Sequence, residues 1–393
     1  MFFEPISADG ILFFILYGVT GVVPFIAALY LLLRKGNAFA PDVTPPLLLR
    51  RWAASFFVMA ALGHVWWLLF YLYSHDLHSV DDYLHSAGYV VIVILDYVTQ
   101  FTAIAGTLLA MLQDRKRPVW PVFVATLPFA ALGGVFMVNP SEQLMLIVIA
   151  YTCCSCLVFT IYMVFSVRQY GRWLRDNYAD LERKEVWQTH VAVFFFILLF
   201  FLYTFVEVDS DILFYFLHLS YLLLFVLLLW RVETLPQLDG ISSEKTCTAS
   251  VAEAQGISEA VDASEVRPQS LSASPVNIAL VQIEQLLAEH CVDTQLYLQH
   301  DLSLHQLALA IGTNRSYLSQ YFSSRGITYN TYINNLRINH FINRYQAAAI
   351  VGQPVTAQQL ASESGYRSYS TFSLAFKQRT GLSVTAWMRN TEG

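Results

Sequence analysis

Two groups of hydrogen-bonding side chains lie near the C-terminal end of the chain, in TNRSYLSQ at 313–320 and in YRSYSTFS at 366–373. Arginine and amide side chains form paired hydrogen bonds with phosphates and base edges, and serine hydroxyls bond to either. These residue types therefore fit a DNA surface, provided that each group lies on the exposed face of one helix. The side chains concerned are Asn314, Arg315, Ser316, Ser319 and Gln320 in the first group, and Arg367, Ser368, Tyr369, Ser370 and Ser373 in the second.

An internal repeat supplies the elements that would position both groups. SLHQLALAIG at 303–312 recurs as TAQQLASESG at 356–365, an offset of 53 residues. Each copy begins with Ser or Thr followed three residues later by Gln, which predicts a capping box at the start of a helix. Each copy ends in a glycine, Gly312 or Gly365, which suits the left-handed backbone of a tight turn.

A second helix is predicted after each turn, with its apolar anchors facing inward and its polar group facing outward. The anchors are Leu318 and Phe322 in the first copy, and Phe372 and Phe376 in the second. A polar second helix after a short glycine turn is the shape that enters a DNA major groove. A helical pair used only for protein contact is the alternative, and the matching caps, turns and anchors of two copies favour DNA.

The stretch between the copies, Tyr329–Gln346, predicts one linking helix. Such a helix would hold the two units rigidly enough to meet successive grooves on one side of a duplex. Its inner face would be apolar and would consist of Tyr332, Ile333, Leu336, Ile338 and Phe341.

At these residues the chain resembles the DNA-binding domain of the AraC/XylS family of bacterial transcription regulators. The resemblance rests on LSLHQLALAIGTNRSYLSQYF, on YINNLRI and on QLASESGYRSYSTFSLAFKQRTGLSVTAWMR, and it covers about 90–115 of the 393 residues. It implies that Ser316, Ser319 and Gln320 lie where the first unit contacts bases, and that Tyr369, Ser370 and Ser373 lie at the DNA face of the second. The remaining residues that we expect at the DNA interface are Arg337, Thr356 and Lys377.

The N-terminal part of the chain has the composition of a membrane protein. Apolar residues make up 56% of the chain and charged residues 13%, and the apolar excess is concentrated before residue 232. Each of its apolar runs is long enough to cross about 30 Å of hydrocarbon as a helix, and most lack the polar face of a core helix. The seven runs are 11–33, 52–73, 86–112, 119–138, 144–167, 188–206 and 212–230.

The positions of lysine and arginine predict the orientation of these runs. All 13 Lys and Arg up to residue 231 fall in the second, fourth, sixth or eighth segment outside the runs. Since cytoplasmic loops carry the excess of positive residues, we expect the N-terminus outside and the chain after residue 231 in the cytoplasm of a bacterium, anchored in its inner membrane. The first run is expected to be retained, because Met1–Gly10 carries Glu4 and Asp9 instead of a basic region.

Polar residues within the runs are candidates for sensing, because ionisable groups inside a membrane are costly. The ligand-sensing candidates are His64, Asp96, Gln100 and His218. Hydrogen bonding between helices, which would only fix their packing, is the alternative. The outer loop SHDLHSVDDYLH adds His75, His78 and His85, which could bind zinc or titrate as a pH sensor, or could form an ordinary polar loop.

Three domains are predicted: a seven-helix membrane domain at 1–231, a cytoplasmic linker at 232–275 and the DNA-binding domain at 276–393. The linker is predicted from PQLDGISSEKTCTAS and the residues after it, which have no aromatic side chain and cannot form a core. The inner loop RQYGRWLRDNYADLERKE, at 168–185, is predicted as a helix extension and a charged loop, and a role in passing a signal to the DNA-binding domain stays open.

The sequence therefore predicts an all-α, membrane-bound, one-component transcription regulator that is not an enzyme and needs no cofactor. Its expected partners are double-stranded DNA, the lipid bilayer, a second copy of the chain on DNA, and an unknown small-molecule or environmental signal. A membrane transporter or enzyme with a regulatory DNA-binding tail is the competing class, and helices that only localise the factor are a third.

Overall fold

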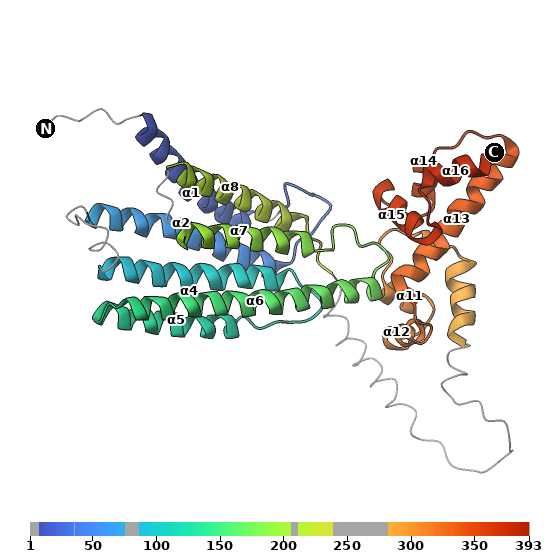
Figure 1. Cartoon of the computed structure of the whole chain (residues 1–393). Helices are drawn as coiled ribbons and strands as arrows, with labels where there is room; N and C mark the ends of the chain where they lie inside the picture. The colour runs from blue at the N-terminus through green and yellow to red at the C-terminus, as the bar shows by residue number, and fades with distance from the viewer. Residues whose placement is uncertain (1–7, 35, 75–85, 206–210, 239–281, 393) are drawn as a thin grey trace, which may run out of the picture. The chain divides into compact units, whose positions relative to one another are not determined.

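The computed structural model describes residues 8–34, 36–74, 86–205, 211–238 and 282–392 (Figure 1). The regular structure in these ranges is helical and contains no β-strand, which confirms the predicted all-α class. The chain divides into two compact units, each taken separately below. The first combines Met1–Tyr170 with Val186–Thr248, and the second combines Gly171–Glu185 with Ala249–Gly393.

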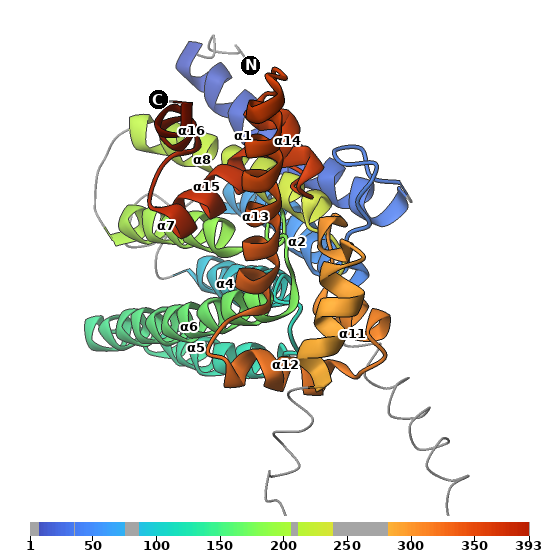
Figure 2. The same ribbon diagram turned by 90° about the vertical axis from the view of Figure 1, so that its right-hand side faces the viewer.

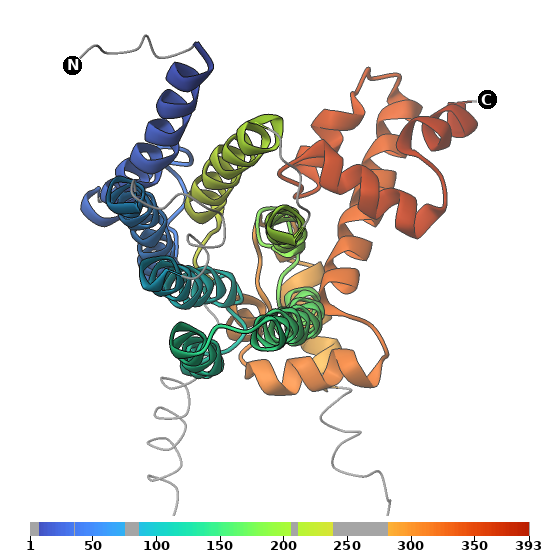
Figure 3. The same cartoon turned by 60° about the vertical axis from the view of Figure 1, so that its left-hand side comes forward.

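The first unit consists of long apolar helices that lie side by side, as Figure 3 shows nearly end-on. Its helices are α1 (Ala8–Leu33), α2 (Leu47–Tyr73), α4 (Ala87–Ala110), α5 (Trp120–Val138), α6 (Glu142–Asn177), α7 (Trp187–Phe205) and α8 (Asp211–Thr234). Within this set α2 packs against α1, α4 and α8, while α8 also contacts α1 and α7. Each of the seven predicted apolar runs is thus a helix, and α6 continues beyond its apolar part to Asn177, with its residues from Gly171 on in the second unit.

Six of these helices are long and apolar enough to cross a membrane, judged by length and composition over the described residues. They are α1, α2, α4, α5, α6 and α8. The seventh predicted span corresponds to α7, whose described apolar stretch, Trp187–Leu199, is shorter. Large apolar side chains remain exposed along the helices, for example Ile26, Phe165 and Leu223.

The end of α8 is joined to α1 and α2 through the buried carboxylate of Glu233. The Tyr30 hydroxyl donates to its Oε2 at 2.9 Å, and Arg50 Nε lies 3.4 Å from its Oε1. Farther on, the backbone N–H of Leu238 donates to Gln113 Oε1 at 2.8 Å. Ordered contacts therefore continue beyond residue 231, where we predicted the first domain to end, and most of the predicted linker lies in 239–281, outside the described residues.

The second unit is built around one central helix, α13 (Tyr329–Val351). Figure 2 shows α11 and α12 at one end of α13 and α14, α15 and α16 at the other. The bounds are α11 (Leu304–Ala310), α12 (Arg315–Ser324), α14 (Ala357–Glu363), α15 (Tyr369–Thr380) and α16 (Val384–Glu392), preceded by the short helices η2 (Ala288–Val292) and η3 (Leu296–Leu298). The two predicted helix-turn-helix units are α11–α12 and α14–α15, and the predicted linking helix is α13.

Each helix-turn-helix unit packs its predicted anchors into a core on α13. Leu318 and Phe322 are buried in the first core together with Ile333 of α13. Phe372 and Phe376 are buried in the second core, where both rings lie beside Phe341 of α13, with centroids 4.5 and 5.6 Å away. Since burying a large apolar side chain contributes about 1.5–3 kcal/mol, these anchors hold both units on the linking helix.

The predicted caps differ between the two copies. In the first, Ser303 accepts from the backbone N–H of Gln306, and the Gln306 side chain accepts in return from the backbone N–H of Ser303, which completes the capping box. In the second, Thr356 accepts from Gln359 N–H, but the Gln359 side chain donates instead to Glu363 Oε1 at 3.0 Å. The predicted box is therefore half formed there, because a carboxylate one turn along the helix binds the glutamine.

Both turn glycines have the predicted left-handed backbone, with φ of +71° at Gly312 and +88° at Gly365. Their surroundings differ. A Cβ at Gly312 would meet no atom within 4 Å, whereas a Cβ at Gly365 would lie 2.7 Å from the carbonyl oxygen of Leu298 and 3.0 Å from Nε of Arg337. Gly365 is thus required both by its backbone conformation and by close approach.

We expect Gly365→Ala to destabilise the compact C-terminal unit that contains α11–α16 more than Gly312→Ala does. Both substitutions carry the left-handed strain of about 1–2 kcal/mol, and only the first adds an overlap with backbone, worth about 1–3 kcal/mol more. Native-state hydrogen exchange of the α13 amides, measured on the full-length protein in detergent, gives both losses from one helix. Equal losses for the two variants would contradict the close packing at Gly365.

Candidate nucleic-acid interface

The second helix of each unit begins at a side-chain cap and presents a polar outer face. Asn314 Oδ1 accepts from the N–H of Tyr317 at the start of α12, and Ser368 Oγ accepts from that of Thr371 at the start of α15. A helix N-terminus capped in this way carries a partial positive charge that favours an anion such as a phosphate. Thr356 caps α14 in the same manner, so three of the predicted DNA residues serve as caps.

The outer faces of α12 and α15 consist of the predicted residues. On α12, Ser316 and Gln320 are exposed and Ser319 is half-buried. On α15, Ser370, Ser373 and Lys377 are spaced at helical intervals, so they share one face, which also carries the exposed Leu374. Tyr369 begins α15, and its ring lies 5.8 Å from the anchoring ring of Phe372.

Positive charge at this interface is modest. From Val276 to the end the chain has eight Lys and Arg against six Asp and Glu, a net charge of +2. Several of these cations are already paired, with Arg325 on Glu284 and Arg344 on Glu363. The exposed Lys377 and Arg389 add charge near the second unit. Because phosphate neutralisation supplies most non-specific affinity, a single copy is expected to bind DNA weakly.

Arg337 departs from the expectation that it contacts DNA. Arg337 lies on the buried face of α13, and its side chain has 0% exposure. Nε donates to the carbonyl oxygen of Tyr297 at 2.7 Å, and one terminal nitrogen donates to Asp180 Oδ1 at 2.8 Å. The other donates to the carbonyl oxygen of Gln299 at 2.8 Å, and the guanidinium lies 5.4 Å from the ring centre of Tyr366. Arg337 therefore joins core elements, and no part of it is left to reach a phosphate or a base.

Asp180 identifies a part of this unit that the sequence did not predict there. It belongs to the segment Asn177–Lys184, which begins at the last residue of α6 and packs with the two helix-turn-helix pairs. Ala179 of this segment is buried in the first core, and its N–H donates to the carbonyl oxygen of Leu302 at 3.2 Å. Tyr178 and Ser303 form an antiparallel bridge pair. A charged loop alone carries no signal for this packing, because its partners lie more than 100 residues away along the chain.

Two of the predicted DNA cations contact this segment or its neighbours. Arg315, at the first turn of α12, donates from Nε and from a terminal nitrogen to Asn177 Oδ1, at 2.9 and 2.7 Å. Arg367 lies 2.6 Å from Asp301, whose other oxygen is 2.9 Å from Lys184. Burial by itself raises the pKa of Asp301, but Lys184 and then Arg367 outweigh it and hold that pKa below its usual value. Asp301 is therefore ionised and paired at neutral pH.

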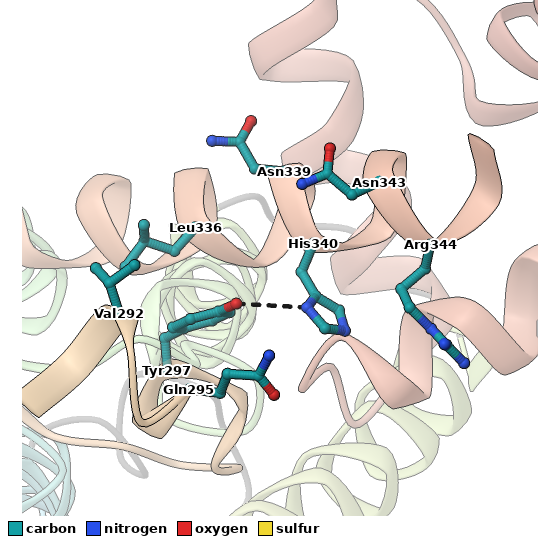
Figure 4. A pocket seen from close by; sticks show the side chains of 8 residues that line it. All are labelled: Val292, Gln295, Tyr297, Leu336, Asn339, His340, Asn343 and Arg344. Carbon is teal, nitrogen blue, oxygen red and sulfur yellow. Dashed lines mark hydrogen bonds between the residues drawn. The ribbon is translucent and has the colours of Figure 1, made fainter. Parts of the chain in front are cut away.

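A pocket of about 410 Å³ opens on the same unit, between α13 and the chain at η2 and η3 (Figure 4). The Tyr297 hydroxyl and His340 Nδ1 are 3.4 Å apart within it. Burial lowers the pKa of His340, so its imidazole is neutral at pH 7 and suited to a polar, uncharged neighbour. The lining residues are Val292, Gln295, Tyr297, Leu336, Asn339, His340, Asn343 and Arg344.

The sensing candidates of the first unit form two separate polar groups. Asp96 of α4 accepts from the indole nitrogens of Trp66 and Trp67 on α2, at 2.9 and 2.5 Å, and from Gln100 at 3.0 Å. The two indole donors lie on α2, so the carboxyl group joins α4 to α2. The arrangement accords with the packing role that the sequence left open.

The second polar group surrounds His64 of α2. Its Nε2 lies 3.0 Å from Thr20 Oγ1, and its Nδ1 lies 2.9 Å from the carbonyl oxygen of Ala60. The rings of Tyr17 and His218 lie 5.1 and 6.3 Å from the ring of His64. His75, His78 and His85 lie outside the described residues, and the described ranges hold no group of three or more potential metal ligands.

We expect Arg337→Met to lower the stability of the second unit by about 3–5 kcal/mol, because it leaves the buried Asp180 without its counter-charge. Arg315→Ala removes an arginine that is only half-buried and bonds to a neutral amide, and we expect a loss of about 1 kcal/mol. Hydrogen exchange of the α13 amides in the full-length protein distinguishes the two. If Arg337→Met were as stable as Arg315→Ala, the buried ion pair would not support the fold.

The helix-turn-helix part of the chain is similar to a known protein family. Residues 307–390 match the family model described as a helix-turn-helix domain. No curated protein and no solved structure matches the chain. The match begins within α11 and ends within α16, so it covers both units together with α13. The C-terminal part of the chain is therefore a helix-turn-helix DNA-binding domain of the AraC type.

Proposed function

We propose that this protein is a membrane-bound, one-component transcription regulator that binds promoter DNA sequence-specifically through its two helix-turn-helix units. The observation that carries the proposal is the pair of capped, outwardly polar helices, α12 and α15, attached to opposite ends of α13 within an AraC-type domain. Base contacts would come from Ser316, Ser319 and Gln320 in the first unit. In the second they would come from Tyr369, Ser370 and Ser373.

The length of α13 supports binding to one side of the duplex. Its 23 residues, at about 1.5 Å each, span about 34 Å, which is close to one helical turn of B-DNA. Two units separated on that scale can enter successive major grooves. Because the net charge is small, we propose that two copies act together on DNA, where effective concentration would raise a weak single-copy affinity.

Membrane attachment is supported by the exposed apolar surface of the first unit. Large side chains such as Ile26, Phe165 and Leu223 are each about half or more exposed on helices long enough to span a bilayer. In water such a surface would associate, whereas hydrocarbon solvates it, and a helix satisfies its own backbone hydrogen bonds there. The lysine and arginine distribution favours an outer N-terminus and a cytoplasmic DNA-binding domain in the inner membrane.

A sensing role for the membrane domain would act through its polar contacts. The Asp96 hydrogen bonds join α2 to α4, and the His64 contacts join α2 to α1. A signal that disturbed either set would change the packing of these helices. This is the route by which we propose that an external or membrane-borne signal enters the protein.

Genome-wide DNA occupancy tests the regulatory function. We expect discrete promoter peaks for the full-length protein, and we expect Gln320→Ala to weaken them, since one good base contact is worth about 1–3 kcal/mol. Gln346→Ala makes the same change at an exposed position of α13 away from both second helices and should leave the peaks intact. Wild-type protein without promoter peaks would overturn the function, and peaks unaffected by Gln320→Ala would remove that residue from the interface.

Topology is tested with two reporter fusions. We expect a reporter joined after Leu238 to be active in the cytoplasm, because the basic segments lie on that side. A reporter inserted after Asn139, between α5 and α6, should report an outer location. Exchanged signals at the two sites would contradict the proposed orientation, and cytoplasmic signals at both would contradict an odd number of membrane crossings between them.

A further inference from the structure

The segment Asn177–Lys184 occupies polar groups that face DNA in the function proposed above. Its Asn177 oxygen accepts both hydrogen bonds of Arg315 at the first turn of α12. Its Glu182 carboxylate accepts from the hydroxyl of Thr371 in the first turn of α15 at 3.1 Å. One short segment thus binds the N-terminal ends of both second helices, which are the ends that approach base edges in helix-turn-helix complexes.

The segment is held by more than these outer contacts. Asp180 is paired with the buried Arg337, and its Oδ2 also accepts from the backbone N–H of Asp301 at 2.8 Å. Asn330 of α13 donates to the carbonyl oxygens of Tyr178 and Ala179. These contacts form a defined docking site on the domain, with a hydrogen-bonded backbone and a buried carboxylate.

We propose that Asn177–Lys184 is an internal competitor of DNA, and that promoter binding requires this segment to leave its site on the helix-turn-helix domain. The inference rests on the proposed function. Arg315 cannot give the same guanidinium hydrogens to Asn177 and to a phosphate, and Glu182 places a negative charge where a phosphate backbone would approach α15. A docked segment therefore lowers affinity for DNA in two ways, by occupying donors and by repulsion.

The position of the segment in the chain suggests what would control whether it is docked or released. It follows α6 directly and leads into α7, so it is continuous with two of the apolar helices. A rearrangement of α6 or α7 would act on the segment through the covalent backbone.

A reversible cross-link tests the competition directly. Tyr178 and Ser303 form an antiparallel bridge pair, and the Cα atoms of such pairs lie about 4.5–5.5 Å apart, within the range of a disulfide. The variant Tyr178→Cys/Ser303→Cys would therefore lock the segment in place when oxidised and free it when reduced. Among the natural cysteines, Cys291 is fully buried, and burial raises the pKa of its thiol to about 12, so it is unreactive to mild oxidants.

The measurement is the affinity of the full-length double variant in detergent for the promoter fragment with the highest occupancy in the experiment above. We expect the oxidised form to bind at least about ten-fold more weakly than the reduced form, and the two single variants to be unaffected by oxidation. A disulfide that forms completely and leaves the affinity unchanged would overturn the proposal. A disulfide that does not form would overturn the docking geometry. Wild-type binding to the fragment keeps the regulatory function separate from either outcome.

A second variant removes one of the two parts of the competition, the occupation of Arg315, without disturbing the core. Asn177→Ala deletes the acceptor of Arg315 while Asp180 and Arg337 stay paired. We expect it to raise the affinity for the promoter fragment about three-fold or more, because Arg315 becomes available to DNA. Asn139→Ala, the same substitution at the end of α5 in the other unit, is the control and should not change the affinity. Equal affinities for Asn177→Ala and wild type would argue that Arg315 is not restrained by the segment.

Discussion

The ion pair between Arg337 and Asp180 is the interaction on which the helix-turn-helix domain depends. Both side chains are buried, and removing two charges from water is costly unless every donor finds a partner. Arg337 meets this condition through Tyr297, Gln299 and Asp180, and it lies against Tyr366 at the end of the second turn. Because η3, α13, the second turn and the segment after α6 all meet at this guanidinium, its hydrogen bonds fix their relative positions within the unit.

The positions of the other helices in the domain are set by where each helix begins and ends. Side-chain caps start α11, α12, α14 and α15, and positive-φ glycines redirect the chain between the helices of each pair. The aromatic anchors then hold each pair on α13. Since α13 is a single helix, its length sets the distance between α12 and α15. The positions of its apolar residues around the helix axis set the directions in which the polar faces of α12 and α15 point. Two independent units joined by a flexible loop would have no such fixed spacing.

The repeat, caps, turns, anchors and linking helix could be predicted from the sequence because each is a local pattern. Ser303 and Gln306, or Leu318 and Phe322, are neighbours on one helix, and their spacing carries the information. The role of Arg337 could not be predicted in this way, because a motif fixes its place on α13 but not whether that side faces solvent or core. Its partner Asp180 lies 157 residues away in a segment of mixed charge. The second capping box failed for a local reason, since Glu363 is a better partner for Gln359 than the cap backbone.

The docked segment is also a second connection between the helix-turn-helix domain and the apolar helices. The sequence predicts a linker at 232–275 as the connection between the two parts of the chain. Asn177–Lys184 provides a second connection, only a few residues from α6 and α7, for as long as Asp180 remains bound to Arg337. Release of that one segment would therefore alter two properties together. It would remove the short connection that the segment makes, and it would free the N-terminal ends of α12 and α15. In the regulator proposed above, a signal would need no rigid lever through the predicted linker, because it would act on whether the short connection is occupied.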